Sequence, residues 1–117
     1  MKPLQDITVI DFTRVLAGPT CTRILAELGA KVTKIEPPAG DLSRAGSPTV
    51  EGFAGYFLQL NGGKRNLCID LNWPEAREIV FGLCARADMV VENFRPGTMT
   101  SFGLSYDALK AVNPQLV

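Results

Sequence analysis

The chain has 117 residues, which is enough for one domain with a single modest core. Apolar residues make up 46% of it, and that share excludes a disordered protein. Lys and Arg (12) balance Asp and Glu (12), so the composition predicts no general attraction to nucleic acid or to an anionic membrane.

The first third of the chain carries strand, helix and strand signals in that order. Residues 7–12 are rich in β-branched side chains and predict a strand. Gly18 and Pro19 predict the start of a helix, because proline is favoured in the first helical turn. An apolar face at helical spacing is expected from Cys21, Ile24, Leu25 and Leu28. Residues 31–36 alternate in polarity and predict a second strand.

The middle of the chain begins with a loop. Residues 39–52 contain several Gly, Ser and Pro residues and predict a long loop, a type of segment that is often functional. Residues 53–60 predict a short helix with Phe53, Phe57 and Leu60 on one side. Residues 61–63 predict a sharp turn, and residues 67–71 a third strand.

The last third repeats the helix and strand alternation. Asn72 is the predicted cap of a helix whose core face is formed by Ala76, Ile79, Val80, Leu83 and Ala87. Residues 89–93 predict a fourth strand, Ser105 the cap of a short last helix, and residues 115–117 the opening of another strand. This alternation predicts parallel βαβ units and an α/β fold.

The residue types exclude several kinds of site. The chain has no histidine, so it cannot form a Ser-His or Cys-His dyad or a zinc site that uses histidine. Its three cysteines are odd in number and widely spaced, which predicts buried thiols rather than a disulfide framework. No metal site is expected.

Two kinds of anion site are considered from the residues alone. Ligands of open α/β sheets bind at the carboxyl ends of strands, and Glu36 ends a strand where an acid could hold a ribose hydroxyl. A dinucleotide site is nevertheless disfavoured, because Gly18 is the only glycine of the required fingerprint. Lys64, Arg65 and Arg95 lie beside strand ends, where they are either phosphate ligands or solvated charges.

Residues 9–19 resemble the opening motif of the class III CoA-transferases, a family that includes formyl-CoA transferase, carnitine CoA-transferase and α-methylacyl-CoA racemase. The likeness continues in order through residues 28–30, 34–41, 61–67, 70–71, 88–97 and 113–114. The resemblance covers essentially the whole chain.

The resemblance implies a Rossmann-like large domain, a small domain and a homodimer of interlocked chains. Residues 1–117 then form the N-terminal, CoA-binding part of the large domain, with an incomplete parallel sheet and flanking helices. The implied ligands are coenzyme A, acyl-CoA and a carboxylic acid, with no metal, nucleic acid or membrane involved. The implied location is the cytoplasm.

The resemblance also implies contacts with CoA at nine positions, each of which matches a particular part of the CoA molecule. Val15 and Leu16 match the loop beside the thioester, and Pro37 matches the stretch near the adenine. The nucleotide and its phosphates are matched by Leu60, Lys64 and Arg65. The pantetheine and diphosphate are matched by Asn93, Phe94 and Arg95. Leu16 stands where formyl-CoA transferases carry glutamine, and Pro37 where many members carry arginine.

The family's nucleophilic aspartate lies beyond the strand that residues 115–117 are expected to open, so no catalytic residue is predicted in this chain. Asp11 is predicted to be a polar cap beside the loop that follows it. The sequence therefore predicts the CoA-binding portion of an acyl-CoA:carboxylate CoA-transferase, inactive by itself. The alternatives are a portion of an α-methylacyl-CoA racemase and a non-enzymatic CoA-binding or interaction module.

Overall fold

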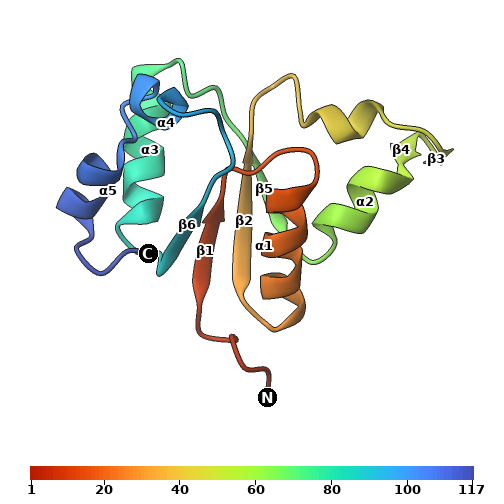
Figure 1. The fold of residues 1–117 in the computed structure, drawn as a ribbon, viewed down its shortest axis with the longest axis horizontal. Coiled ribbons are helices and arrows are strands. Elements are labelled where there is room, and N and C mark those ends of the chain that lie inside the picture. Colours follow the sequence, from red (N-terminus) through yellow and green to blue (C-terminus); the bar gives the residue numbers. More distant parts are fainter.

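A computed structural model describes residues 1–117 and shows a parallel sheet between two layers of helices (Figure 1). The four strands are β1 (Thr8–Asp11), β2 (Lys31–Glu36), β5 (Arg65–Cys68) and β6 (Met89–Val91). They lie in the order β5-β2-β1-β6, with every neighbouring pair parallel. The predicted α/β fold is thus confirmed.

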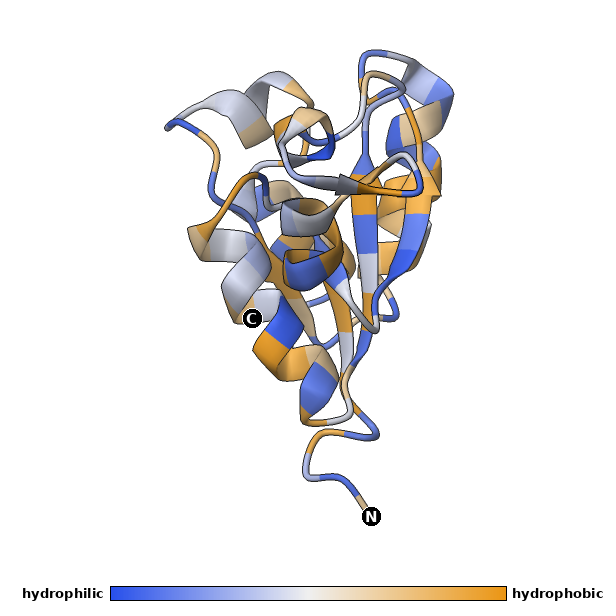
Figure 2. Ribbon diagram, turned by 90° about the vertical axis from the view of Figure 1, so that its right-hand side faces the viewer, coloured by the Kyte–Doolittle hydropathy of each residue, from blue (hydrophilic) through white to orange (hydrophobic).

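The helices divide between the two faces of the sheet. The larger core lies on the face covered by α3 (Pro74–Cys84) and α5 (Tyr106–Val112), where Ile10, Phe12 and Ile35 are buried. The smaller core lies on the other face, under α1 (Ala17–Glu27), and contains Val9, Ala30 and Val32. Helices on both faces carry hydrophobic and hydrophilic residues side by side, as expected of surface helices (Figure 2).

The predicted apolar face of α1 is wrong for Cys21, Ile24 and Leu28, which are exposed, whereas Leu25 packs against the smaller core as predicted. Its buried residues are Gly18, Pro19 and Thr22, whereas Ile24 and Leu28 are 50% and 41% exposed. Helical periodicity assumes that a helix packs on apolar side chains. Here the upper half of the underlying sheet face is charged, so the start of α1 turns small and polar residues toward it.

The predicted loop 39–52 contains regular structure. It includes the 3₁₀ helix η1 (Leu42–Ala45) and the strand β3 (Thr49–Val50), which pairs with β4 (Phe53–Ala54) in a small antiparallel hairpin. This hairpin projects from the side of the molecule (Figure 1). The predicted helix 53–60 begins two residues later, as α2 (Gly55–Asn61), because its first two residues belong to β4.

The third predicted strand is displaced by about two residues, to β5. The chain turns away after it because the Asp70 carboxylate accepts hydrogen bonds from the Asn72 N–H at 3.0 Å and the Asn72 Nδ2 at 2.7 Å. Asn72 is therefore not the cap of α3. That position belongs to Trp73, which makes no capping side-chain hydrogen bond.

The remaining differences are small. Ile79, which was predicted to lie on the core face of α3, is 53% exposed. Cys84, which was not predicted there, is buried on that face. Burial raises the pKa of the Cys84 thiol to about 11, while Cys21 and Cys68 are exposed, contrary to the prediction of three buried thiols. The short helix α4 (Thr98–Ser101) was not predicted from the sequence.

One prediction near the C-terminus agrees with the structure, and a second agrees in part. Ser105 caps α5, with its Oγ accepting the Ala108 N–H at 3.2 Å. Val117 lies beside β6, where its carbonyl accepts the Val90 N–H at 2.8 Å and its N–H donates to Asp88 O at 3.0 Å. The two bonds have the pattern of a parallel pair, although residues 115–117 do not form a strand. None of the helices has the length and apolar character needed to span a bilayer.

Candidate functional site

The carboxyl ends of the strands meet along the upper edge of the sheet in Figure 1. Alternate residues of a strand point to the same face, so Asp11 of β1 lies on the α1 face with Lys34 and Glu36 of β2. All three are buried. The lower half of this face is apolar and the upper half is charged. Ligand sites of open α/β sheets occupy this edge.

Asp11 and Lys64 form a buried ion pair at this edge. The Lys64 Nζ lies 3.0 Å from the Asp11 Oδ2, and the two side chains are 2% and 0% exposed. Asp11 also accepts hydrogen bonds from the Thr13 N–H at 2.8 Å and the Thr22 Oγ1 at 2.6 Å. The carboxylate thus ties the end of β1 to the loop and helix that follow, which confirms the predicted role of Asp11 as a polar cap.

Lys64 has no free hydrogen-bond donor. Besides Asp11, its ammonium group donates to Asn61 Oδ1 at 2.9 Å and to the carbonyl of Pro19 at 3.1 Å. Three acceptors use the three N–H bonds of the ammonium. Burial lowers the pKa of Lys64 even though the nearby Asp11 acts to raise it. In this arrangement Lys64 supports the loop after β1, and its three N–H bonds are all used within the chain.

Residues that follow β6 hold the loop after β1 in place. The side-chain amide of Asn93, which follows β6, accepts the Arg14 N–H at 2.8 Å and donates to the Arg14 carbonyl at 2.9 Å. The Arg14 guanidinium in turn lies 4.5 Å from the centre of the Phe94 ring. The loops after β1 and β6 are therefore joined at the edge of the sheet, although about 80 residues separate them in the sequence.

Two backbone features shape the same loop. Val15 has a φ of +69°, in the left-handed region that β-branched residues rarely occupy, and such a residue typically costs about 1–3 kcal/mol. Gly18 packs so closely that a Cβ there would lie 2.5 Å from Thr13 Cγ2 and 3.1 Å from Asn93 Cγ. The loop conformation is thus imposed by its surroundings.

An open groove of about 440 Å³ lies between the loops after β1 and β6. It is lined by Arg14, Val15, Leu16, Ala17, Leu42, Asn93, Phe94, Arg95 and Thr98. Five of the nine predicted CoA contacts are in this lining, namely Val15, Leu16, Asn93, Phe94 and Arg95. The groove combines an apolar wall with the exposed side chain of Arg95, so it can accept an elongated ligand that carries phosphate.

The four other predicted contacts lie outside this groove. Pro37 lines an adjoining apolar hollow of about 100 Å³ that shares Arg14 and Phe94 with the groove. Leu60 is 5% exposed and is the buried residue of α2. Lys64 is buried as described, and Arg65 is exposed at the first position of β5.

Arg65 and Arg95, which the sequence places beside strand ends, do not lie close together. Arg65 begins β5, which is one edge of the sheet, whereas Arg95 follows the end of β6, which is the opposite edge. Two strands therefore separate them, and they belong to opposite ends of parallel strands. The strand order that produces this separation is not readable from the spacing of the residues.

Glu36 is unavailable for the ribose contact that a dinucleotide site would require. Its carboxylate accepts two hydrogen bonds from Arg44, at 2.7 and 2.8 Å, one from the Asp41 N–H at 2.9 Å, and one from the side chain of Asn66. The Arg44 guanidinium also stacks 3.7 Å from the centre of the Phe57 ring. Glu36 is a structural anchor for the segment that contains η1.

Sequence reasoning missed the ion pair between Lys34 and Asp41. The Lys34 Nζ lies 3.0 Å from the Asp41 Oδ2, and the side chains are 1% and 0% exposed. A signal was present, because Asp11, Lys34 and Glu36 occupy same-face positions at the ends of two strands that the sequence itself predicts. Charges repeated on one strand face indicate a buried polar network when that face is also covered by a helix.

The carboxylates of this network predict sensitivity to acid. Burial alone would raise the pKa values of Glu36 and Asp41, but hydrogen bonds and nearby cations outweigh it and lower both. The unfolded chain therefore binds more protons than the folded chain at acidic pH, so stability is lost as the pH falls. We expect the urea midpoint to be constant near pH 7 and to drop below about pH 4.5.

Urea unfolding at a series of pH values checks this expectation. The variant Glu36→Gln removes one of the two groups, so its midpoint should fall less steeply with acid than that of the wild type. A midpoint that stays unchanged down to about pH 3 would show that the two carboxylates do not have lowered pKa values in the folded state.

A second groove, of about 350 Å³, lies beside β6 and α5 and is mainly apolar. Its single cation, Lys110, is already bonded to the carbonyls of Pro114 at 2.7 Å and Leu116 at 2.9 Å. The other polar residues in its lining are Glu92 and Tyr106, and no arginine lines it. The groove between the loops after β1 and β6 is therefore the stronger candidate site.

The sequence of the chain is similar to that of known CoA-transferases. The sequence model of CoA-transferase family III matches residues 4–117. A succinyl-CoA:mesaconate CoA-transferase of Haloarcula hispanica is 48% identical over 122 aligned residues, which cover 100% of this chain and 31% of that protein. A formyl-CoA:oxalate CoA-transferase of Bradyrhizobium sp. is 38% identical, covering 99% of this chain and 28% of that protein.

A solved structure is similar throughout the chain. The crystal structure of a CAIB/BAIF family protein from Brucella suis superposes with a TM-score of 0.93 at 45% identity, covering 99% of this chain and 32% of that one. The chain therefore spans about a third of the length of the proteins that it matches. The matched portion is their N-terminal part.

Proposed function

The chain belongs to CoA-transferase family III, and we propose that it forms the CoA-binding portion of an acyl-CoA:carboxylate CoA-transferase. Its relatives act on CoA thioesters and carboxylates, as the name succinyl-CoA:mesaconate CoA-transferase states. In this proposal the chain holds CoA, and the nucleophilic aspartate implied by the resemblance is contributed from outside residues 1–117. The homodimer and the cytoplasmic location remain predictions.

The observation that carries the proposal is the groove between the loops after β1 and β6. Its wall of Val15, Leu16 and Phe94 suits the flexible, partly apolar pantetheine arm, and the exposed Arg95 suits a phosphate group. Arginine offers two parallel N–H donors to phosphate oxygens, which gives both affinity and orientation. Lys64 contributes indirectly, by holding Asp11 and the carbonyl of Pro19 beneath this loop.

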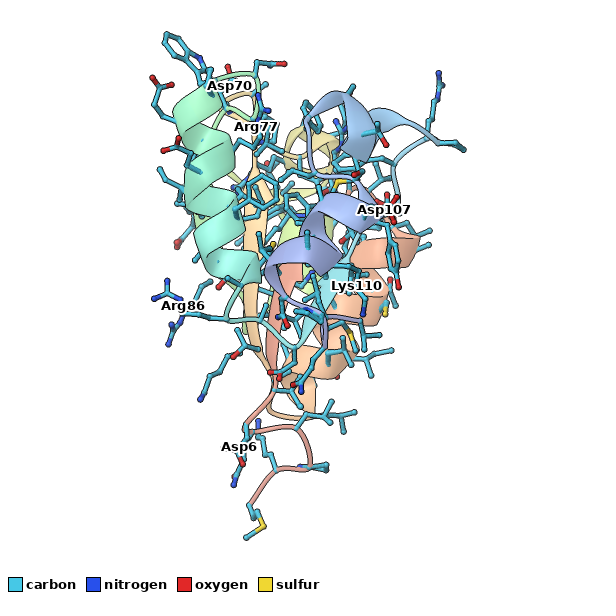
Figure 3. All side chains as sticks on the ribbon, turned by 90° about the vertical axis from the view of Figure 1, so that its left-hand side faces the viewer. Asp6, Asp70, Arg77, Arg86, Asp107 and Lys110 are labelled. Carbon is cyan, nitrogen blue, oxygen red and sulfur yellow. The ribbon has the colours of Figure 1, made fainter.

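Binding of CoA tests the proposal. A charge-assisted hydrogen bond contributes about 1.5–3 kcal/mol, so Arg95→Ala should weaken CoA by roughly tenfold or more. Isothermal titration calorimetry with CoA on the wild type and the variant measures this change. Arg86→Ala is a matched control, because Arg86 projects from the lower end of α3, far from the upper edge marked by Asp70 (Figure 3). It should bind CoA like the wild type.

A second control distinguishes the two arginine positions predicted from the sequence. Arg65 begins the far edge strand, so Arg65→Ala should leave CoA affinity unchanged if the groove alone binds the phosphates. If Arg65→Ala weakened CoA binding and Arg95→Ala did not, the phosphates would bind near the opposite edge of the sheet, at β5. Equal affinity in all the variants, or no binding by the wild type, would remove the proposal.

A further inference from the structure

Two of the segments that line the groove, the loop after β1 and the segment after β2, depend on one carboxylate that lies outside it. Asp41 caps η1, with its Oδ1 accepting the Ser43 N–H at 2.9 Å and the Ser43 Oγ at 2.7 Å. The residue between them, Leu42, lines the groove. The same carboxylate faces the Val15 N–H of the loop after β1, at 3.3 and 3.4 Å from its two oxygens. Asp41 therefore links the loop after β1 to the segment after β2.

Lys34 completes this link from below. Its ammonium group lies 3.0 Å from Asp41 and donates to the carbonyl of Thr13 at 2.7 Å. Lys34 is buried, and neither it nor Asp41 lines the groove. A buried ammonium between a carboxylate and a backbone carbonyl fixes the distance between them. Breaking the first contact leaves a buried charge unpaired, and breaking the second leaves a hydrogen-bonding group unsatisfied. The pair is thus a rigid support beneath the loop.

The loop requires such a support because Val15 is held in an unfavourable conformation. A β-branched residue at a φ of +69° moves to negative φ unless surrounding contacts prevent it. The Val15 N–H belongs to the peptide unit on one side of this φ, and the Thr13 carbonyl belongs to the peptide unit before it. Both groups are bonded to the Lys34–Asp41 pair, which therefore holds the backbone that leads into Val15. Relaxation at Val15 would carry its side chain, and that of Leu16, away from the groove.

We propose that Lys34 and Asp41 are positioning residues of the binding groove, which hold Val15 and Leu16 in the conformation that accepts the ligand. This inference rests on the proposed function, in that the ligand is taken to be CoA. Neither residue contacts the ligand. Their effect on binding is transmitted through the backbone of residues 13–15 and through the cap of η1.

The test replaces the whole pair by neutral side chains of similar size. The variant Lys34→Met, Asp41→Asn avoids the isolated buried charge that either single change would leave. We expect circular dichroism to show the same helix and strand content as the wild type. CoA affinity by calorimetry should fall by about tenfold, and the carbon chemical shifts of Val15 in the NMR spectrum should change to those of a residue at negative φ.

A coupled variant separates positioning from general weakening of the fold. Glycine adopts positive φ without steric cost, so in a Val15→Gly background the loop conformation no longer needs to be imposed. Removing the pair should then reduce CoA affinity by a smaller factor than it does with Val15 present. An equal factor in both backgrounds would overturn the inference, because it would show that the pair does not act through Val15.

The NMR readout keeps this test independent of the proposed function. If the wild type does not bind CoA but Val15 shifts on removal of the pair, the proposed function fails and the positioning role stands. If Val15 keeps its shifts, the positioning role fails whatever CoA does. Should the paired variant not fold, Val15→Gly alone decides: relief of an imposed conformation should raise the thermal midpoint, and a lowered midpoint would overturn the inference.

Discussion

Replacing Lys64 by methionine is expected to destabilise the chain by about 3–5 kcal/mol, because it leaves the Asp11 carboxylate buried without a counter-charge. Both side chains are almost completely inaccessible to solvent, and their charged atoms are 3.0 Å apart. Asp11 would keep the hydrogen bonds from Thr13 and Thr22, which do not neutralise its charge. A loss of this size is a large part of the stability of a domain of this length.

Urea unfolding followed by circular dichroism measures the loss. Arg65→Met is the matched control, since Arg65 is the next residue, is exposed and makes no ion pair; it should change stability by no more than about 0.5 kcal/mol. The paired variant Asp11→Asn, Lys64→Met should recover much of the loss, because no buried charge remains. If Lys64→Met were as mild as Arg65→Met, the ammonium would be free to bind a ligand, as the sequence first suggested.

The order and type of the main elements could be predicted because the local signals agree with the fold. Strands β1, β2 and β6 coincide with runs of β-branched or alternating residues, and α3 begins at a proline. The parallel arrangement followed from the alternation of strand and helix. The hairpin of β3 and β4 could not be predicted in this way, since each of its strands has only two residues and carries almost no periodic signal.

The orientation of α1 could not be predicted because its signal lies in other segments. The apolar stripe that contains Ile24 and Leu28 suggests a buried face, yet the helix start packs on Asp11. Only the pairing of β1 with β2 brings Asp11, Lys34 and Glu36 onto one face and makes that face polar. Tertiary pairing thus overrides the helical pattern.

The residues of the candidate site also differ in how far the sequence predicts their positions. Val15, Leu16, Asn93, Phe94 and Arg95 follow the carboxyl ends of predicted strands, so the sequence places them at one end of a parallel sheet. The pairing of β1 with β6 then brings the two sets together. Arg65 is the first residue of β5, and its distance from Arg95 depends on the strand order β5-β2-β1-β6. Local spacing carries no information about that order.

Replacing Gly18 by alanine is the second change for which we expect a large effect, a loss of about 3 kcal/mol or more of unfolding free energy. The new Cβ would overlap the Thr13 side chain. Thr13 cannot move aside easily, because it is fully buried, its N–H donates to Asp11 and its carbonyl accepts from Lys34. Asn93, the other neighbour, is held by both backbone groups of Arg14. The clash would therefore be relieved only by moving the loop that forms the groove.

The same substitution in another helix should have the opposite sign. Gly82 lies in α3, is exposed, and has nothing within 4 Å of the position a Cβ would take. Gly82→Ala should therefore stabilise the chain by about 0.5–1 kcal/mol, through the lower conformational entropy of alanine in the unfolded state and its higher helix propensity. Thermal unfolding of both variants under one condition makes the comparison. A stabilising effect at both positions would mean that α1 can shift away from Thr13, and that the loop between them is not held as closely as the packing of Gly18 indicates.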